Sequence, residues 1–221
     1  KNGINMAYSS SNNSIIENNI TSNSNFGIDL YECSNNTISG NNIEANAYDG
    51  IIIQENSNNN TVIGNSITAN NYGGVSLLSS SNCVISGNNI TNNTDYGVGL
   101  ESSSGNTVSG NNITENANTG IVVDSSSNNI LYHNNFINNT IQVDVTPNYN
   151  NTWDNGYPSG GNYWSDYEAR YPNATEIDAS GIWNTSYVIA ANNTDQYPLM
   201  NQYVIPEFPS FLTLPLFMIG T

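Results

Sequence analysis

The sequence predicts an all-β protein, a right-handed parallel β-helix of about six coils with an aromatic-rich C-terminal cap. Two observations predict this fold. Glycines recur every 23 or 24 residues, at Gly3, Gly27, Gly50, Gly74, Gly97 and Gly120. Each glycine is followed by apolar residues at alternate positions, which is the spacing of a strand rather than of a helix. Repeats of this length bury their apolar faces by stacking on one another.

Three apolar columns define three short strands in each coil. The first column follows the repeat glycine, as in Val98 and Leu100. The other two columns are Ile15, Ile38, Val62, Ile85, Val108 and Leu131, and Ile20, Ile43, Ile67, Ile90, Ile113 and Phe136. Each strand should lie beside its counterpart one coil away, at a spacing of about 4.8 Å. Parallel crossovers are overwhelmingly right-handed, which predicts the hand of the coil.

Asparagines recur at two equivalent positions of the coil. The first set is Asn18, Asn41, Asn65, Asn88, Asn111 and Asn134, and the second is Asn13, Asn36, Asn60, Asn106 and Asn129, with Cys83 in the remaining coil. Asparagine tolerates left-handed turn conformations, and stacked amides can bond to one another along a ladder. We interpret both sets as turn and ladder structure, with a polar binding stripe as the alternative.

The composition divides the chain into three parts. Repeats occupy residues 1–145, and the last of them is an alternating strand of Ile141, Val143 and Val145. Because Lys1 falls inside the first coil, we expect a further portion of the protein upstream of it. Residues 146–202 show no echo of the repeat and hold all three tryptophans, so we predict a cap that closes the last coil, with a sugar-stacking surface as the alternative. Residues 203–221 form an apolar, proline-containing tail.

Charge and cysteine content narrow the function classes. Two Lys and Arg residues stand against 18 Asp and Glu, giving a formal charge of −16, so nucleic acid is excluded as a partner. Cys33 and Cys83 occupy different positions of coils two repeats apart, roughly 9 to 10 Å, which is too far for a disulfide.

Two motifs carry a family resemblance. The coil pattern, as in Gly97–Ile113, resembles the repeats of NosD-like β-helix proteins, also grouped as carbohydrate-binding and sugar-hydrolase β-helices. The segment WDNGYPSGGNYWSDY with NNTDQYPLM resembles the C-terminal segment of archaeal surface proteins of that group, but residues 178–187 depart from the acidic run that its members often carry. The tail beginning Pro206–Glu207–Phe208–Pro209 resembles the start of an archaeal sorting signal, in which a membrane anchor follows. The resemblance implies an extracellular or cell-surface location.

Two acid pairs should stack on neighbouring coils, Glu32 with Glu55 and Glu101 with Asp124. Each pair should lie about 5 Å apart, near the separation used by retaining glycosidases. No basic residue accompanies them, so solvated acids, a cation site such as calcium, and a glycan-binding site stay open as alternatives. No catalytic residue, specific metal ligand or cofactor is predicted.

Twelve Asn-x-Ser/Thr sequons are candidates for N-glycosylation: Asn12, Asn19, Asn35, Asn59, Asn89, Asn92, Asn112, Asn138, Asn150, Asn173, Asn184 and Asn192. Together these observations favour a non-enzymatic cell-surface β-helix that binds carbohydrate or other surface proteins. Two alternatives remain: a polysaccharide-active, glycosidase-like enzyme fragment, and the metal-delivery accessory role implied by the NosD resemblance.

Overall fold

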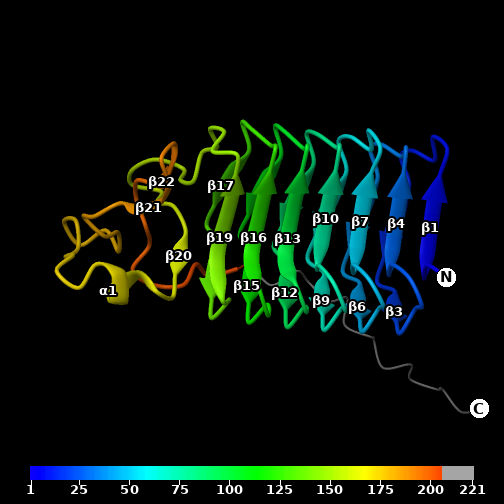
Figure 1. Cartoon of the computed structure of the whole chain (residues 1–221), viewed down its shortest axis with the longest axis horizontal. Coiled ribbons are helices and arrows are strands. Elements are labelled where there is room, and N and C mark those ends of the chain that lie inside the picture. Colours follow the sequence, from blue (N-terminus) through cyan, green and yellow to red (C-terminus); the bar gives the residue numbers. More distant parts are fainter. Residues whose placement is uncertain (206–221) are drawn as a thin grey trace, which may run out of the picture.

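The computed structural model describes residues 1–205, and these form an elongated stack of coils with a cap at the C-terminal end (Figure 1). The predicted parallel β-helix of about six turns is confirmed. Within the described residues, every strand of the coils pairs in parallel with its counterpart one coil away. Of the predicted tail, residues 206–221 lie outside the described part of the chain.

Three sheets run along the stack. Sheet 1 comprises β1 (Ile4–Ala7), β4 (Ile28–Tyr31), β7 (Ile51–Gln54), β10 (Val75–Leu78), β13 (Tyr96–Glu101), β16 (Thr119–Asp124) and β19 (Ile141–Thr146). Sheet 2 comprises β2 (Ser14–Ile16), β5 (Thr37–Ser39), β8 (Thr61–Ile63), β11 (Val84–Ser86), β14 (Thr107–Ser109) and β17 (Ile130–Tyr132). Sheet 3 comprises β3 (Asn19–Thr21), β6 (Asn42–Glu44), β9 (Ser66–Thr68), β12 (Asn89–Thr91), β15 (Asn112–Thr114), β18 (Asn135–Ile137) and β20 (Tyr163–Trp164).

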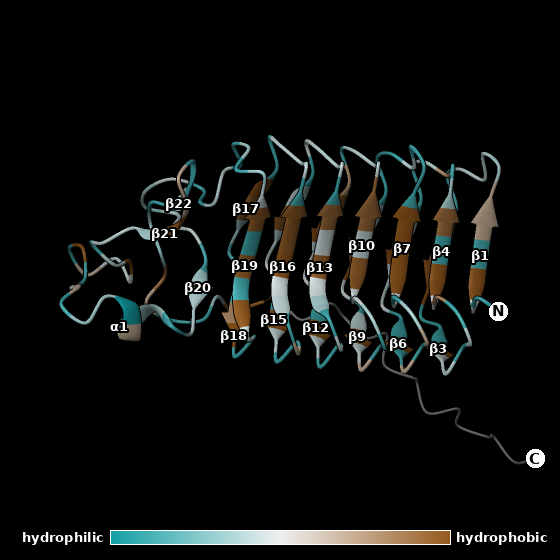
Figure 2. Ribbon diagram, in the orientation of Figure 1, coloured by the Kyte–Doolittle hydropathy of each residue, from teal (hydrophilic) through white to brown (hydrophobic). Residues whose placement is uncertain are grey.

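The predicted register is confirmed. Val98 pairs with Val75, and in the other two sheets Val108 pairs with Ile85 and Ile113 with Ile90. All three apolar columns pack into one core, although Ile4 and Met6 at the start of the first column are only partly buried. Figure 2 shows the hydrophobic residues along the strands. In β19 the inward residues are Val143 and Val145, whereas Ile141 pairs with Thr119 and is exposed.

The repeat glycine is required by close packing. A Cβ at Gly97 would lie 2.6 Å from Ile113 Cγ2 and 2.7 Å from the carbonyl oxygen of Gly120. The chain therefore turns from sheet 3 into sheet 1 directly against the third apolar column. No larger residue fits there without moving a neighbouring coil.

Both predicted asparagine ladders are present, and a third accompanies them. In the first, the Nδ2 of Asn65 donates to Asn88 Oδ1, and the Nδ2 of Asn88 donates to Asn111 Oδ1. The third ladder comprises Asn23, Asn46, Asn70, Asn93, Asn116 and Asn139. Across residues 1–205, no buried polar side-chain atom lacks a partner, so the ladders satisfy the turns that close each coil.

The cap continues the core and the ladders. It contains α1 (Tyr167–Arg170) and the hairpin of β21 (Tyr187–Ala190) and β22 (Asn193–Asp195). Trp164 pairs with Phe136 in sheet 3, stacks on its ring at 4.4 Å, and stacks on Tyr187 at 4.2 Å on the other side. Trp153 and Trp164 are fully buried, which confirms that they close the last coil. Trp183 is only half-buried and stacks on Tyr167.

Two of the three ladders end on residues of the cap. Asn162 Oδ1 accepts from the Nδ2 of Asn134, and Asn162 N–H donates to the buried carboxylate of Asp195 at 2.7 Å. Asp195 also accepts from the indole N–H of Trp164 and the N–H of Tyr197. Burial raises the pKa of Asp195 to about 7, against the lowering effect of these donors.

No helix in the described residues has the length and apolar character needed to cross a bilayer.

Candidate functional site

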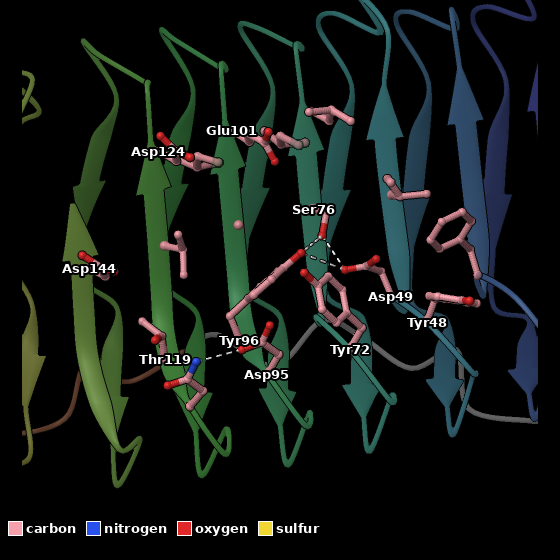
Figure 3. A pocket seen from close by; sticks show the side chains of 18 residues that line it. Tyr48, Asp49, Tyr72, Ser76, Asp95, Tyr96, Glu101, Thr119, Asp124 and Asp144 are labelled. Atoms are coloured by element: carbon pink, nitrogen blue, oxygen red, sulfur yellow. Dashed lines mark hydrogen bonds between the residues drawn. The ribbon is translucent and has the colours of Figure 1, made fainter. Parts of the chain in front are cut away.

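A groove with a volume of about 560 Å³ lies on the outer face of sheet 1 (Figure 3). It extends from Phe26, just before β4, to Asp144 on β19, so it runs along the stack across several coils. Its volume lies in the range of small-molecule and oligomer binding sites. The groove is therefore long enough to hold an extended ligand parallel to the axis of the coils.

Three side chains from three coils meet on the floor of the groove. Ser76 Oγ donates to Asp49 Oδ1 at 2.5 Å, and the Tyr96 hydroxyl donates to the same oxygen at 3.1 Å. The hydroxyls of Ser76 and Tyr96 are 2.9 Å apart. None of these contacts uses Asp49 Oδ2. Figure 3 shows the three groups converging between the aromatic residues on one side and the acids on the other.

Two glycines outside the repeat position make room for this cluster. A Cβ at Gly73 would lie 2.2 Å from Tyr96 Cε2 and 2.5 Å from Asp49 Oδ1. A Cβ at Gly99 would lie 2.8 Å from the same atom, Tyr96 Cε2. Because the flat ring of Tyr96 packs onto bare backbone at both positions, its hydroxyl can reach the carboxylate two coils away.

Burial controls the protonation of the cluster. Asp49 is only 3 % exposed, and this burial raises the pKa of its carboxyl, against hydrogen bonds from Ser76 and Tyr96 that lower it. Burial and then the charge of Asp49 raise the pKa of the Tyr96 phenol. Asp49 therefore retains its proton to higher pH than a surface aspartate does, and Tyr96 remains a hydrogen-bond donor.

Aromatic rings form one part of the groove wall. Phe26 and Tyr48 are paired with ring centroids 5.6 Å apart, and Tyr72 meets Tyr96 edge to face at 5.3 Å. Tyr48 and Tyr72 are 52 % and 45 % exposed although they are large and aromatic. Exposed ring faces of this kind suit sugar rings, which have an apolar face and polar edges.

Acids form the other part of the wall. The predicted stacking of Glu101 and Asp124 is confirmed by their pairing between β13 and β16, and both line the groove together with Asp95 and Asp144. Asp95 is half-exposed, and its Oδ1 accepts from the Nδ2 of Asn118 at 2.9 Å.

The other predicted acid pair lies elsewhere. Glu32 and Glu55 occupy equivalent left-handed turn positions, with φ of 53° and 54°, and are exposed outside the groove lining. The structure brings neither of them toward the Asp49 cluster. Whether either pair binds a cation or a glycan stays a prediction.

The twelve sequon asparagines avoid the groove. Eleven are exposed, Asn112 is half-exposed, and none lines the groove. The ladder asparagines are different residues, several of which immediately follow a sequon position, and from the second coil on they are buried. Glycans attached at the predicted acceptors would therefore leave sheet 1 accessible.

A family model described as periplasmic copper-binding protein (NosD) matches residues 1–169. No curated protein sequence matches the chain. A point variant of the periplasmic alginate epimerase AlgG superposes with a TM-score of 0.62 at 24 % identity, over 66 % of this chain and 35 % of that one. AlgG itself gives a TM-score of 0.53 at 26 % identity, over 60 % of this chain and 35 % of AlgG. The chain thus spans about a third of the length of these proteins.

The similarity to an epimerase contradicts the prediction of a non-enzymatic protein. The solved structures that share this architecture include an enzyme, the periplasmic alginate epimerase AlgG. The prediction considered only Glu32, Glu55, Glu101 and Asp124, which have no basic neighbour. It missed the buried Asp49 cluster, because the burial that changes the acidity of Asp49 depends on residues one and two coils away.

The described residues do not fit the copper named in the family description. No group of three or more His, Cys, Asp and Glu side chains comes together in residues 1–205. Cys33 and Cys83 are buried and unbridged, as predicted, and burial raises the pKa of the Cys83 thiol to about 11, which disfavours the thiolate that binds metals. The ring of His133 is stacked on Tyr203, and its Nε2 is 2.9 Å from the carbonyl oxygen of Ser159.

Proposed function

This chain belongs to the family of the periplasmic protein NosD, and from that premise we propose that it is an exported envelope protein that binds and cleaves a polysaccharide in the groove of sheet 1. The export is supported by the family description and by the periplasmic location printed for AlgG. The observation that carries the proposal is the buried Asp49–Ser76–Tyr96 cluster on the floor of a groove with exposed aromatic walls.

In this proposal the aromatic wall holds the sugar chain. Tyr48 and Tyr72 offer ring faces at successive coils, and their backbone positions are about 4.8 Å apart along the axis. A glycan lying along the axis would stack successive residues on these rings. Each stacked ring contributes on the order of 1 kcal/mol beyond its buried area.

The chemistry is assigned to two carboxyl groups in different environments. Asp49 is buried with a raised pKa and serves as the proton donor, while half-exposed Asp95, two coils away at roughly 10 Å, serves as the base. This axial distance between the two backbone positions is close to the upper end of the roughly 6.5–9.5 Å that separates the carboxyl groups of inverting glycosidases, which admit a water between acid and base. The glycosidic C–O bond breaks as its oxygen takes the proton of Asp49; water bonds to the anomeric carbon and loses a proton to Asp95.

The test is a screen of polysaccharides for the release of reducing ends by the parent and by single variants. Asp49→Asn and Asp95→Asn should each lower kcat by at least a hundredfold, because general acid–base groups contribute about 10²–10⁴-fold. Tyr72→Ala should instead raise KM. Glu115→Gln, at an exposed acid outside the groove, is the matched control. Cleavage that persists unchanged in both aspartate variants would refute the assignment.

A further inference from the structure

The charge of the groove restricts the class of polysaccharide that it can hold. Five acids line it: Asp49, Asp95, Glu101, Asp124 and Asp144. The lining contains no Lys, Arg or His. The whole chain has only Lys1, Arg170 and His133 as basic residues.

None of these basic residues lines the groove, and each has other neighbours in the fold. Arg170 lies in the cap, where it forms an ion pair with Asp166 and packs over the ring of Tyr187. His133 follows β17 and is stacked against Tyr203. Lys1 precedes β1 at the other end of the stack. The groove lining itself therefore offers no cation to offset a carboxylate or sulfate on a bound sugar.

We infer that the groove takes a glycan without acidic groups, that is, a neutral or amine-bearing chain, and discriminates against polyuronates and sulfated chains. This inference rests on the proposed function, since it names the substrate class of the same groove. The aromatic wall supplies affinity through ring stacking, which is independent of charge. The acids supply the discrimination, because like charges placed against each other across an interface are strongly unfavourable.

The inferred class differs from the polyuronate in the name of the alginate epimerase. The two chains share the coil architecture, but identity near one quarter leaves the outward side chains free to differ. In this chain the outward-facing residues of sheet 1 that pair in register with Ser76 of the groove floor are Asp29, Ile52, Gly99, Val122 and Asp144. This column holds no cation that could pair with a uronate.

The experiment compares chains that share a backbone and differ in charge. The pairs are mannohexaose with hexamannuronate, and methyl-esterified with free hexagalacturonate; hexamers of chitin and chitosan add the neutral and amine-bearing classes. Affinities are measured by calorimetry at low salt, once with EDTA and once with added Ca²⁺. At least one neutral or amine-bearing chain should bind, and each uncharged member should bind at least tenfold more tightly than its anionic partner.

Three variants locate the effect. Tyr72→Ala should weaken binding of all chains alike. The double variant Glu101→Gln with Asp124→Asn should narrow the ratio between the affinities for neutral and anionic chains by about threefold or more. The reason is that it removes two of the four lining acids other than the protonated Asp49. Glu17→Gln with Glu115→Gln removes two exposed charges outside the groove and should leave the ratio unchanged.

The outcomes separate the two claims. If an anionic chain binds as tightly as its neutral partner, with or without Ca²⁺, and Tyr72→Ala abolishes that binding, the inferred class is wrong while the groove remains the binding site. If no chain of any charge binds, or Tyr72→Ala has no effect, the proposed function itself fails. A ratio unchanged in the groove double variant would also refute the role given to the acids.

Discussion

Removing one amide from the first asparagine ladder should destabilise several coils. Asn88 is buried, and its Oδ1 accepts from both the N–H and the Nδ2 of Asn65 at 2.9 Å. Its Nδ2 lies 3.0 Å from Val62 O, Ser86 O and Asn111 Oδ1, so two protons serve three acceptors. Asn88→Ala therefore loses about four full hydrogen bonds.

The expected loss of stability follows from those bonds. At about 1 kcal/mol for each neutral hydrogen bond, the sum is roughly 4 kcal/mol, and the orphaned N–H of Asn65 accounts for a large share of it. Asn88→Asp should lower the free energy of unfolding more than Asn88→Ala does at pH 7. The aspartate keeps an oxygen that accepts from Asn65, but its second oxygen takes the place of the Nδ2 and faces the oxygens of Val62, Ser86 and Asn111 without a proton to donate. At low pH, where the new carboxyl regains a proton to donate, part of this difference should disappear.

The assay is chemical denaturation followed by circular dichroism, with amide hydrogen exchange at Asn65 as the local measurement. Asn89→Ala is the matched control, since Asn89 is exposed on the adjacent position and should change stability by no more than about 0.5 kcal/mol. The reasoning would be refuted if Asn88→Ala lay within about 1 kcal/mol of the parent, or if Asn88→Asp were no worse than Asn88→Ala.

Three further predictions concern the ladders and the cap. Cys83→Asn should stabilise the protein by about 1 kcal/mol, because Cys83 interrupts the ladder between Asn60 and Asn106. The midpoint of thermal unfolding should therefore rise. A lower midpoint would mean that the site cannot hold an amide side chain. Trp164→Ala should cost roughly 3 to 5 kcal/mol and half-buried Trp183→Ala clearly less, as measured by urea denaturation; equal losses would contradict the cap packing. Because the pKa of Asp195 is higher in the folded protein than in the unfolded chain, the folded state binds the extra proton between about pH 4 and 7. The free energy of unfolding should therefore fall by up to about 1.4 kcal/mol for each unit by which the pH rises through this window. Thermal melting of Asp195→Asn should lack this slope.

The repeat pattern predicted the fold well because each coil buries the same face. The columns through Val98, Val108 and Ile113 fixed strand positions and register, since a shift of one residue would turn the apolar side chains outward. The third asparagine ladder was missed although Asn93 and Asn116 recur four residues before the repeat glycine. This third set recurs as regularly as the other two. It was overlooked because it precedes the first apolar column, whereas the two predicted ladders lie at the turns before the second and third columns.

The groove could not be predicted in the same way, because it is made by departures from the repeat. The residue before the repeat glycine is Phe26, Asp49, Gly73, Tyr96 and Thr119 in successive coils. Such variation at one position of a regular repeat marks a surface that the core does not constrain. However, only the structure shows that Gly73 leaves space for Tyr96, and that Asp49 is buried beneath it.

The direction of the ladders gives the stack two chemically different ends. Within each ladder the amide-to-amide bonds all run one way, from the Nδ2 of one coil to the Oδ1 of the next coil toward the C-terminus, so these bond dipoles add along the axis. The C-terminal end is therefore the positive pole and presents N–H groups that need acceptors. Gln142 in β19 accepts from the last amide of one ladder, and the cap provides the acceptors for the other two, namely Asn193 and the carboxylate of Asp195. A protein that replaced this cap would have to present oxygen acceptors to the stack.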